Sequence, residues 1–271
     1  MALAACLSAP SIAFAQEAVS DPWEGVNRGL FAVHETIDQA VLEPVARGYR
    51  AVTPRPVRSG VTNFLRNLRG PVIFANDVLQ GEFSRAGTTA ARFGVNTTVG
   101  IVGVFDPATN FGLERHDEDF GQTLAVWGVG SGPYLFVPIF GPSNVRDTTG
   151  RVVDMVFDPL NWARGEEAET ARIARGVLTG VSVREQVLET VDGIRANSVD
   201  PYASIRTSYS LLRESAIENG RTDVQDLPEF DDIPETPDSS SGGGSAVSYL
   251  PQQEGIGLTY FALDYVTGEA S

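Results

Sequence analysis

Residues 21–50 read DPWEGVNRGLFAVHETIDQAVLEPVARGYR and contain the clearest structural signal in the chain. Asp21 can cap a helix, Pro22 suits the first helical position, and Glu24 can reach back to the cap. Behind this start, apolar residues recur every three or four positions, namely Val26, Leu30, Val33, Ile37, Val41 and Val45. This spacing predicts a long amphipathic helix with one continuous apolar face.

The same pattern extends outward along the chain. Thr53-Pro54 predicts a second helix that reaches Leu68. Further helices are expected at 72–79, 83–93 and 146–157, one or two within 168–199, and a last one from Asp200-Pro201. No alternating strand pattern stands out before residue 222. The helical spacing therefore predicts an all-α protein.

Two segments depart from this pattern. Residues 93–105, FGVNTTVGIVGVF, carry no charge and are too short to cross a bilayer. They fit either a buried core helix or strand, or a segment that lies within a membrane or lines an internal passage. Residues 127–147, WGVGSGPYLFVPIFGPSNVRD, alternate glycines with small residues before several prolines. Glycine and proline there predict a hairpin with a glycine hinge and an exposed apolar stretch at 134–140.

Composition excludes several functional classes. The 271 residues include 35 acidic and 20 basic ones, for a net charge of −15, which argues against general nucleic-acid binding. One cysteine and two histidines cannot supply a zinc finger or an iron–sulfur cluster. We therefore expect no metal and no cofactor.

No catalytic constellation stands out from the sequence. The G-x-S-x-G nucleophile motif is absent. His116, beside Asp117, Glu118 and Asp119, could act as a general base or belong to a calcium site. Acid clusters of this kind are more often solvated charges or partners of arginine. His34, on the first helix, is expected at the surface or at an interface.

The two ends of the chain differ from its body. Residues 1–15 are small and apolar, as in an export signal. Either cleavage follows Ala13-Phe14-Ala15, or Leu3-Ala4-Ala5-Cys6 is a lipobox in which Cys6 becomes acylated. Residues 222–271 are acidic, rich in proline and glycine near their start, and expected to be disordered, with a short apolar segment near the end.

Several long motifs in a fixed order resemble one family. They are DPWEGVNRGLF, LEPVARGYRAVTPRPVRSGVTNFLRNL, NDVLQGEF, RFGVNTTVGIVGVFD, HDEDFGQTLAVWGVGSGPY and PIFGPSNVRD. Together they resemble the MlaA (VacJ) family across residues 21–159, and more weakly to residue 213. We therefore assign residues 21–221 to one MlaA-like domain, between the export signal 1–15 and the acidic tail 222–271.

The resemblance implies a non-enzymatic phospholipid transporter at the periplasmic face of the Gram-negative outer membrane. Members are ring-like bundles of amphipathic helices that lie in the membrane plane. A central channel takes mislocalised phospholipid from the outer leaflet and passes it to a soluble periplasmic carrier resembling MlaC, which maintains lipid asymmetry. Trimeric porins are the expected membrane partners. The alternatives are a structural outer-membrane lipoprotein and a periplasmic hydrolase that uses His116.

The resemblance also suggests site residues. The hinge of the family's hairpin corresponds to Gly128, Gly130 and Gly132. The gating region falls at Phe31, Ala32 and Val33, although the family's asparagine–phenylalanine pattern is altered there. The small and polar residues proposed to form the wall of the lipid path are Asn96, Thr97, Thr98, Gly100 and Gly103. Arginine, the only cationic side chain apart from histidine, would meet the lipid phosphate.

Overall fold

The computed structural model describes residues 21–219, and the expected export segment, Cys6 and the acidic tail lie outside this range. The helices are α1 (Glu24–Ile37), the π-helical turn η1 (Asp38–Leu42), α2 (Glu43–Val52), α3 (Arg55–Leu79), α4 (Phe83–Thr98), α5 (Pro107–Asn110), α6 (Phe120–Val126), α7 (Val145–Phe157), the 3₁₀ turn η2 (Pro159–Trp162), α8 (Glu166–Gln186), α9 (Leu188–Asn197) and α10 (Pro201–Ile217). The two short strands are β1 (Tyr134–Val137) and β2 (Gly141–Asn144).

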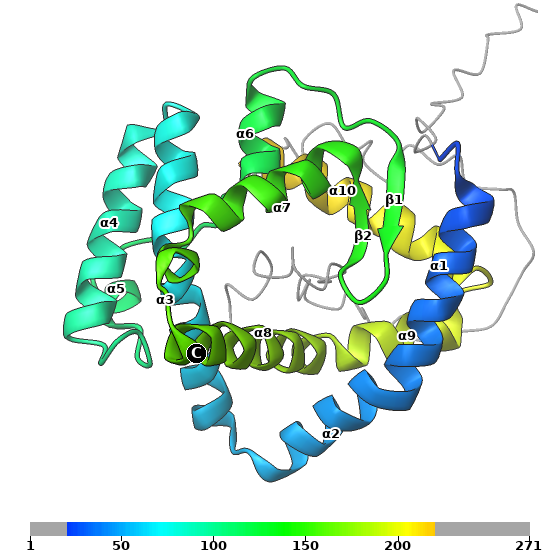
Figure 1. Cartoon of the computed structure of the whole chain (residues 1–271), viewed down its shortest axis with the longest axis horizontal. Coiled ribbons are helices and arrows are strands. Elements are labelled where there is room, and N and C mark those ends of the chain that lie inside the picture. The colour runs from blue at the N-terminus through cyan, green and yellow to red at the C-terminus, as the bar shows by residue number, and fades with distance from the viewer. Residues whose placement is uncertain (1–20, 220–271) are drawn as a thin grey trace, which may run out of the picture.

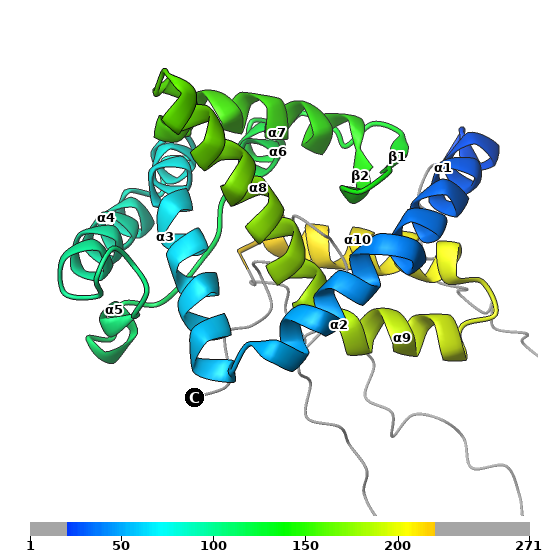
Figure 2. The same cartoon turned by 60° about the horizontal axis from the view of Figure 1, so that its bottom comes forward.

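These elements form a ring, as the resemblance implied. Figure 1 shows α1, α2, α3, α7 and the β1–β2 hairpin arranged around a central region, with α4 and α5 outside α3. Figure 2 shows α8 running obliquely from the α7 side of the ring to α9. Within the described residues, no helix combines the length and the apolar character needed to cross a membrane.

The apolar face predicted for the first helix exists, and its valines are exposed, whereas Leu30 is partly buried. Val26, Val33 and Val41 are 64%, 52% and 52% exposed, whereas Asn27 and His34 are buried. In a water-soluble helix the apolar stripe faces the core and the polar face meets solvent. The first helical segment is therefore inverted with respect to that arrangement.

Two expected features of the helices are wrong. The helices predicted at 53–68 and 72–79 are one helix, because α3 continues through Pro71. The proline removes one backbone hydrogen bond, but the helix continues through it and packs extensively against α4. The reading of 93–105 as a buried core element is also wrong. Helix α4 ends at Thr98, and the loop that follows exposes Val99, Ile101 and Phe105.

The hairpin predicted from the glycine- and proline-rich segment is present. Its strands pair antiparallel, with Tyr134 opposite Asn144 and Val137 opposite Gly141. The apolar stretch 134–140 is not wholly exposed, because alternate side chains of β1 point inward. Tyr134 and Phe136 are almost completely buried against Tyr202 and Tyr209 of α10. The aromatic cluster thus fixes the base of the hairpin to the last helix.

Buried ion pairs connect η1 to α8 and α9 across the ring. Arg184 of α8 donates two hydrogen bonds to the carboxylate of Asp38 in η1, at 2.7 and 2.8 Å. Arg195 of α9 donates a third at 2.7 Å. Asp38 and Arg184 are 0% and 1% exposed. Paired guanidinium and carboxylate groups therefore take the place that apolar side chains occupy in an ordinary core.

Removal of the Asp38 carboxylate should destabilise the ring. In Asp38→Ala, Arg184 would keep a buried charge without its main partner, which costs about 3–5 kcal/mol. Asp192→Ala removes an exposed pair with Arg47, whose value is below about 1 kcal/mol. Urea unfolding of both variants in the same detergent, followed by circular dichroism, measures the difference. Equal losses of unfolding free energy in the two variants would contradict a role of Asp38 in holding the ring together.

Candidate functional site

A cavity of about 350 Å³ lies inside the ring, between α3, α7, α8, α10 and the tip of the hairpin. Its volume is at the lower end of the roughly 300–1,000 Å³ typical of small-molecule sites. The apolar lining residues include Leu65, Val72, Phe140, Met155, Leu160 and Val183. The charged lining residues are Arg69, Asp119, Asp147, Arg151, Asp154, Asp158, Arg172, Arg175 and Arg213. The wall is therefore amphipathic.

Two helices direct polar stripes into this cavity. Asp147, Arg151 and Asp154 recur every three or four residues of α7 and line the cavity together. Arg172, Arg175 and Thr179 do the same on α8. These polar stripes were not predicted from the sequence, although the helical spacing of the charges was visible. The exposed valine and isoleucine residues of the same two helices that do not line the cavity are Val145, Val152, Val156, Ile173 and Val177.

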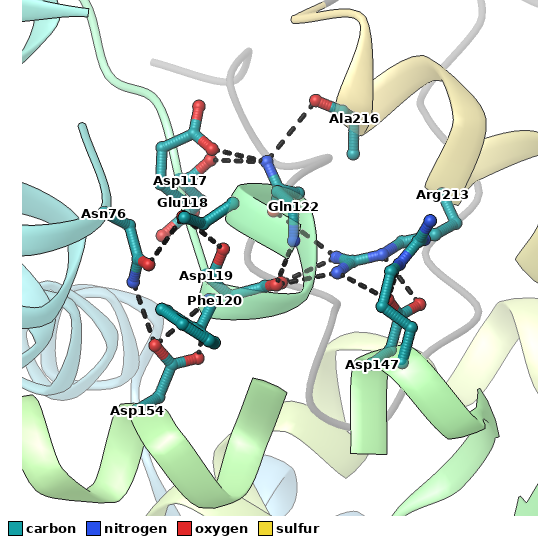
Figure 3. A network of polar contacts seen from close by, with 12 residues as sticks. Asn76, Asp117, Glu118, Asp119, Phe120, Gln122, Asp147, Asp154, Arg213 and Ala216 are labelled. Atoms are coloured by element: carbon teal, nitrogen blue, oxygen red, sulfur yellow. Dashed lines mark hydrogen bonds and ion pairs between the residues drawn. The ribbon is translucent and has the colours of Figure 1, made fainter. Parts of the chain in front are cut away.

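Arg213 of α10 neutralises two acids of the cavity wall (Figure 3). Its guanidinium donates to both oxygens of Asp119, at 2.6 and 2.7 Å, and to Asp147 Oδ1 at 3.0 Å. Burial opposes ionisation of Asp119, yet Arg213 lowers the pKa of this carboxyl to about 2. Asp119 also caps α6 by accepting a hydrogen bond from the Gln122 N–H. The interaction joins α10, α6 and α7 on one side of the cavity.

Asp154 faces the cavity without an arginine partner among the described residues. Its carboxylate accepts hydrogen bonds from Asn76 Nδ2 at 2.9 Å and from the Phe120 N–H at 3.1 Å. Burial, together with repulsion by Asp119, raises the pKa of Asp154 to about 6. Asp154 is therefore an acid of the cavity wall whose charge changes near pH 6.

His116 does not have the geometry of a general base for an activated nucleophile. Its Nε2 lies 3.0 Å from both Asp77 Oδ1 and Thr89 Oγ1, and Thr89 donates to Asp77 at 2.6 Å. A catalytic histidine instead contacts its acid and its nucleophile through opposite ring nitrogens. The cluster joins α3 to α4, and His116 does not line the central cavity.

The neighbouring acids are partners of arginine, as one reading of the sequence expected, but they are buried rather than solvated. Glu118 accepts from Arg85 at 2.7 Å, and Asp117 lies 3.9 Å from Arg69. Burial raises the pKa of Glu118 to about 7. Within residues 21–219, no group of three or more histidine, cysteine or acidic side chains could hold a metal ion.

Helix α1 binds the open edge of β1 through polar side chains. Asn27 donates to the Tyr134 carbonyl and accepts from the Phe136 N–H, both at 3.0 Å. His34, seven residues later on the same face, accepts from the Ile139 N–H at 3.2 Å. The expectation of a surface or interface His34 is corrected, because its ring is 1% exposed beneath the hairpin.

The three gating candidates lie on this helix, and Phe31 packs against the hairpin. The ring of Phe31 packs edge-on against Phe136, with 5.2 Å between the ring centroids. Ala32 and Val33 are exposed. The docking contacts of Asn27 and His34 were missed, although two polar residues spaced by two helical turns interrupt the apolar pattern.

The hinge glycines precede β1 and differ from one another. Gly128 and Gly132 have φ angles of +87° and +67°, in the region that favours glycine. Gly130 is not in this region, and a Cβ there would meet nothing within 4 Å. Mobility about these residues stays a prediction.

The candidate wall residues of the lipid path lie at the outer corner formed by α4, α5 and the loop between them. Asn96 donates to Asp106 and accepts from the Ala108 N–H. Side chains at Gly100 and Gly103 would collide with neighbouring atoms. The hydroxyls of Thr97 and Thr98 bond to the Asn67 side chain and the Gly94 carbonyl. None of the five lines the central cavity, and their role in transport stays a prediction.

Asp154→Asn should remove the contribution of the Asp154 carboxyl group to the pH dependence of the unfolding free energy. A raised pKa means that the native state holds a proton more tightly than the unfolded chain. This stabilisation is present below about pH 4 and is lost as pH rises through about 6. The loss is at most about 3 kcal/mol. Asparagine can still accept both hydrogen bonds, so the difference in unfolding free energy between wild type and variant should change over this range. A constant difference from pH 4 to pH 7.5 would contradict the assignment.

Comparisons with known proteins agree with this architecture. Residues 19–216 match the MlaA lipoprotein family. An uncharacterized protein of Rickettsia bellii is 36% identical over 201 residues, which cover 74% of this chain and 78% of the relative. The intermembrane phospholipid transport system lipoprotein MlaA of Escherichia coli is 33% identical over 217 residues, or 79% of this chain and 84% of that protein.

The fold is also similar to a solved structure described as the structural basis for maintenance of bacterial outer membrane lipid asymmetry. The two share 33% sequence identity with a TM-score of 0.64, over 73% of this chain and 99% of the other. The family match covers most of the chain, and the relatives align over about four fifths of their own length. The chain therefore belongs to the MlaA lipoprotein family.

Proposed function

We propose that this protein is a phospholipid transport protein of the bacterial outer membrane. It lies in the inner leaflet and takes mislocalised phospholipid from the outer leaflet through the centre of its ring. This activity preserves the lipid asymmetry of that membrane. The observation that carries the proposal is the inverted amphipathic character of the ring, apolar outside and charged inside.

The outer surface suits acyl chains. Val26 and Val33 of α1, Val152 of α7 and Val177 of α8 are all more than half exposed. Such surfaces on helices too short or too polar to span a bilayer favour a position in the interfacial plane. Burial in lipid would remove this apolar area from water, which contributes about 25 cal/mol for each Å².

The inner surface suits a head group. Movement of a charged head group through hydrocarbon costs many kcal/mol, because its charge loses hydration. A cavity with arginine and aspartate on α7 and α8, beside apolar residues such as Leu65 and Phe140, reduces that cost. The head group can stay among polar side chains while the acyl chains contact apolar ones. Passive passage of this kind needs no nucleophile, metal or cofactor, and we propose no enzymatic activity.

The hairpin is the element that we propose controls access. Its tip residue Phe140 lines the cavity, and its strands contact α1 and α10. Gly128, Gly130 and Gly132 join it to α6, so it can pivot there while the helices remain in place. Phe31, packed on Phe136, is positioned to resist that movement.

The cellular setting is part of the proposal and rests on family resemblance. The chain is exported, it is anchored through an acyl group if Cys6 is the mature N-terminus, and it faces the periplasm. A soluble periplasmic carrier resembling MlaC would receive the lipid. Trimeric porins would hold the ring in the membrane.

Gly130→Val tests the transport role of the hairpin. The site has free space and no left-handed backbone, so the variant should fold, while the β-branched side chain restricts movement of the hinge. Cells that lack the native gene and express this variant should accumulate surface-exposed phospholipid, measured by labelling of the outer leaflet. Gly87→Val in α4, also in open space, is the matched control and should restore asymmetry.

Other outcomes would favour the alternatives. Normal lipid asymmetry with Gly130→Val would contradict a role of the glycine hinge in transport. Normal asymmetry in cells without the protein would favour a structural lipoprotein. Phospholipid cleavage by purified protein that is lost on replacement of His116 would favour a hydrolase.

A further inference from the structure

Five arginines line the cavity, and four of them are already bonded to the protein. Arg213 pairs with Asp119 and Asp147, Arg175 pairs with Asp158, Arg69 lies near Asp117, and Arg172 donates to the carbonyls of Leu160 and Ala163. Arg151 of α7 makes no hydrogen bond or ion pair with any residue that the structure describes. Its interactions with Tyr209, Asp119, Asp147 and Arg213 are electrostatic.

The position of Arg151 makes this lack of a partner unusual. The side chain is half-buried in the wall of the cavity rather than extended into bulk solvent. Burial lowers the pKa of the guanidinium, even though Asp119, Asp147 and Tyr209 favour its charged form. Arginine stays protonated in proteins, so a partly desolvated positive charge faces the cavity. Such a group is stabilised by an anion that provides the missing hydrogen bonds.

The charges around Arg151 also leave room for an anion. Asp119 and Asp147, the two acids whose charges favour the charged form of Arg151, are both bonded to Arg213. The lining contains five arginines and four aspartates, so one positive charge remains when all are ionised. The pKa of Asp154, raised to about 6, reduces the negative charge further as the pH falls to 6 and below.

We propose that Arg151 binds the phosphate of a phospholipid head group inside the ring. A guanidinium presents two parallel N–H donors that match two oxygens of a phosphodiester. Apolar residues of the same cavity, including Phe140 and Met155, lie where the glycerol and the first acyl carbons would follow. The proposal rests on the transport function above and adds to it the group that recognises the lipid.

The experiment compares lipids that differ only in the phosphate. Purified full-length protein in detergent is titrated with fluorescent phosphatidylglycerol and with diacylglycerol that has the same acyl chains. Wild type should bind phosphatidylglycerol more tightly, and Arg151→Gln should weaken that binding about tenfold without change for diacylglycerol. Arg151→Lys keeps the charge but loses the paired donors. Its affinity for phosphatidylglycerol should therefore lie between those of wild type and Arg151→Gln.

Arg164→Gln is the matched control. Arg164 is exposed, makes no hydrogen bond or ion pair to the described residues, and does not line the cavity. Its replacement removes the same charge and should leave both affinities unchanged. Arg151 holds no structural bond, so Arg151→Gln should unfold at the same temperature as wild type.

Three results would overturn the assignment. They are unchanged phosphatidylglycerol binding in Arg151→Gln, an equal loss for diacylglycerol, or an equal loss in Arg164→Gln. Displacement of the lipid by inorganic phosphate at the same concentration would identify a free phosphate site instead. The proposed function is tested separately by wild type, since a wild-type protein that binds neither lipid contradicts transport itself. A wild type that binds while Arg151→Gln is unaffected contradicts only the role of Arg151.

Discussion

Hydrogen-bonded arginine–carboxylate pairs between distant helices hold this ring together. A ring that surrounds a polar cavity has two exposed faces, and only a thin layer of side chains between them is buried. Arg184 and Asp38 occupy that layer where η1 meets α8, and Arg213 and Asp119 do so where α10 meets α6. Arginine suits these positions, because its rigid fork satisfies two oxygens at once and offsets the loss of hydration.

This construction frees the apolar residues for the outer surface. Because charged and amide groups form the contacts between helices, α1 can bury Asn27 and His34 and expose Val26 and Val33. The same polar residues satisfy the edge of β1, which would otherwise present unpaired backbone groups. The hairpin is thus held by a few polar contacts to α1 and by the aromatic cluster that Tyr134 and Phe136 form with α10.

The charged side chains that hold the ring together also line the cavity. Most of its arginines and aspartates serve two purposes, since they join helices and also line the interior. Arg151 differs because it joins no two elements, and we propose that a ligand supplies the partner of this partly desolvated cation. The helical spacing that brings Arg151 beside Asp147 and Asp154 also places Val152 and Val156 outside, so one helix serves both surfaces.

The sequence by itself was sufficient for the helices, the hairpin and the family, because local spacing, capping residues and glycine–proline clusters act over a few residues. It did not reveal the continuous α3, since packing against α4 outweighs the lost hydrogen bond at Pro71. It also placed His34 wrongly, because a pattern along one helix does not say what lies opposite. Only the tertiary structure decided which face points inward, and it assembled the cavity from α3, α7, α8 and α10 across more than a hundred residues. Contacts between elements so far apart depend on how the ring closes, and no local spacing encodes them.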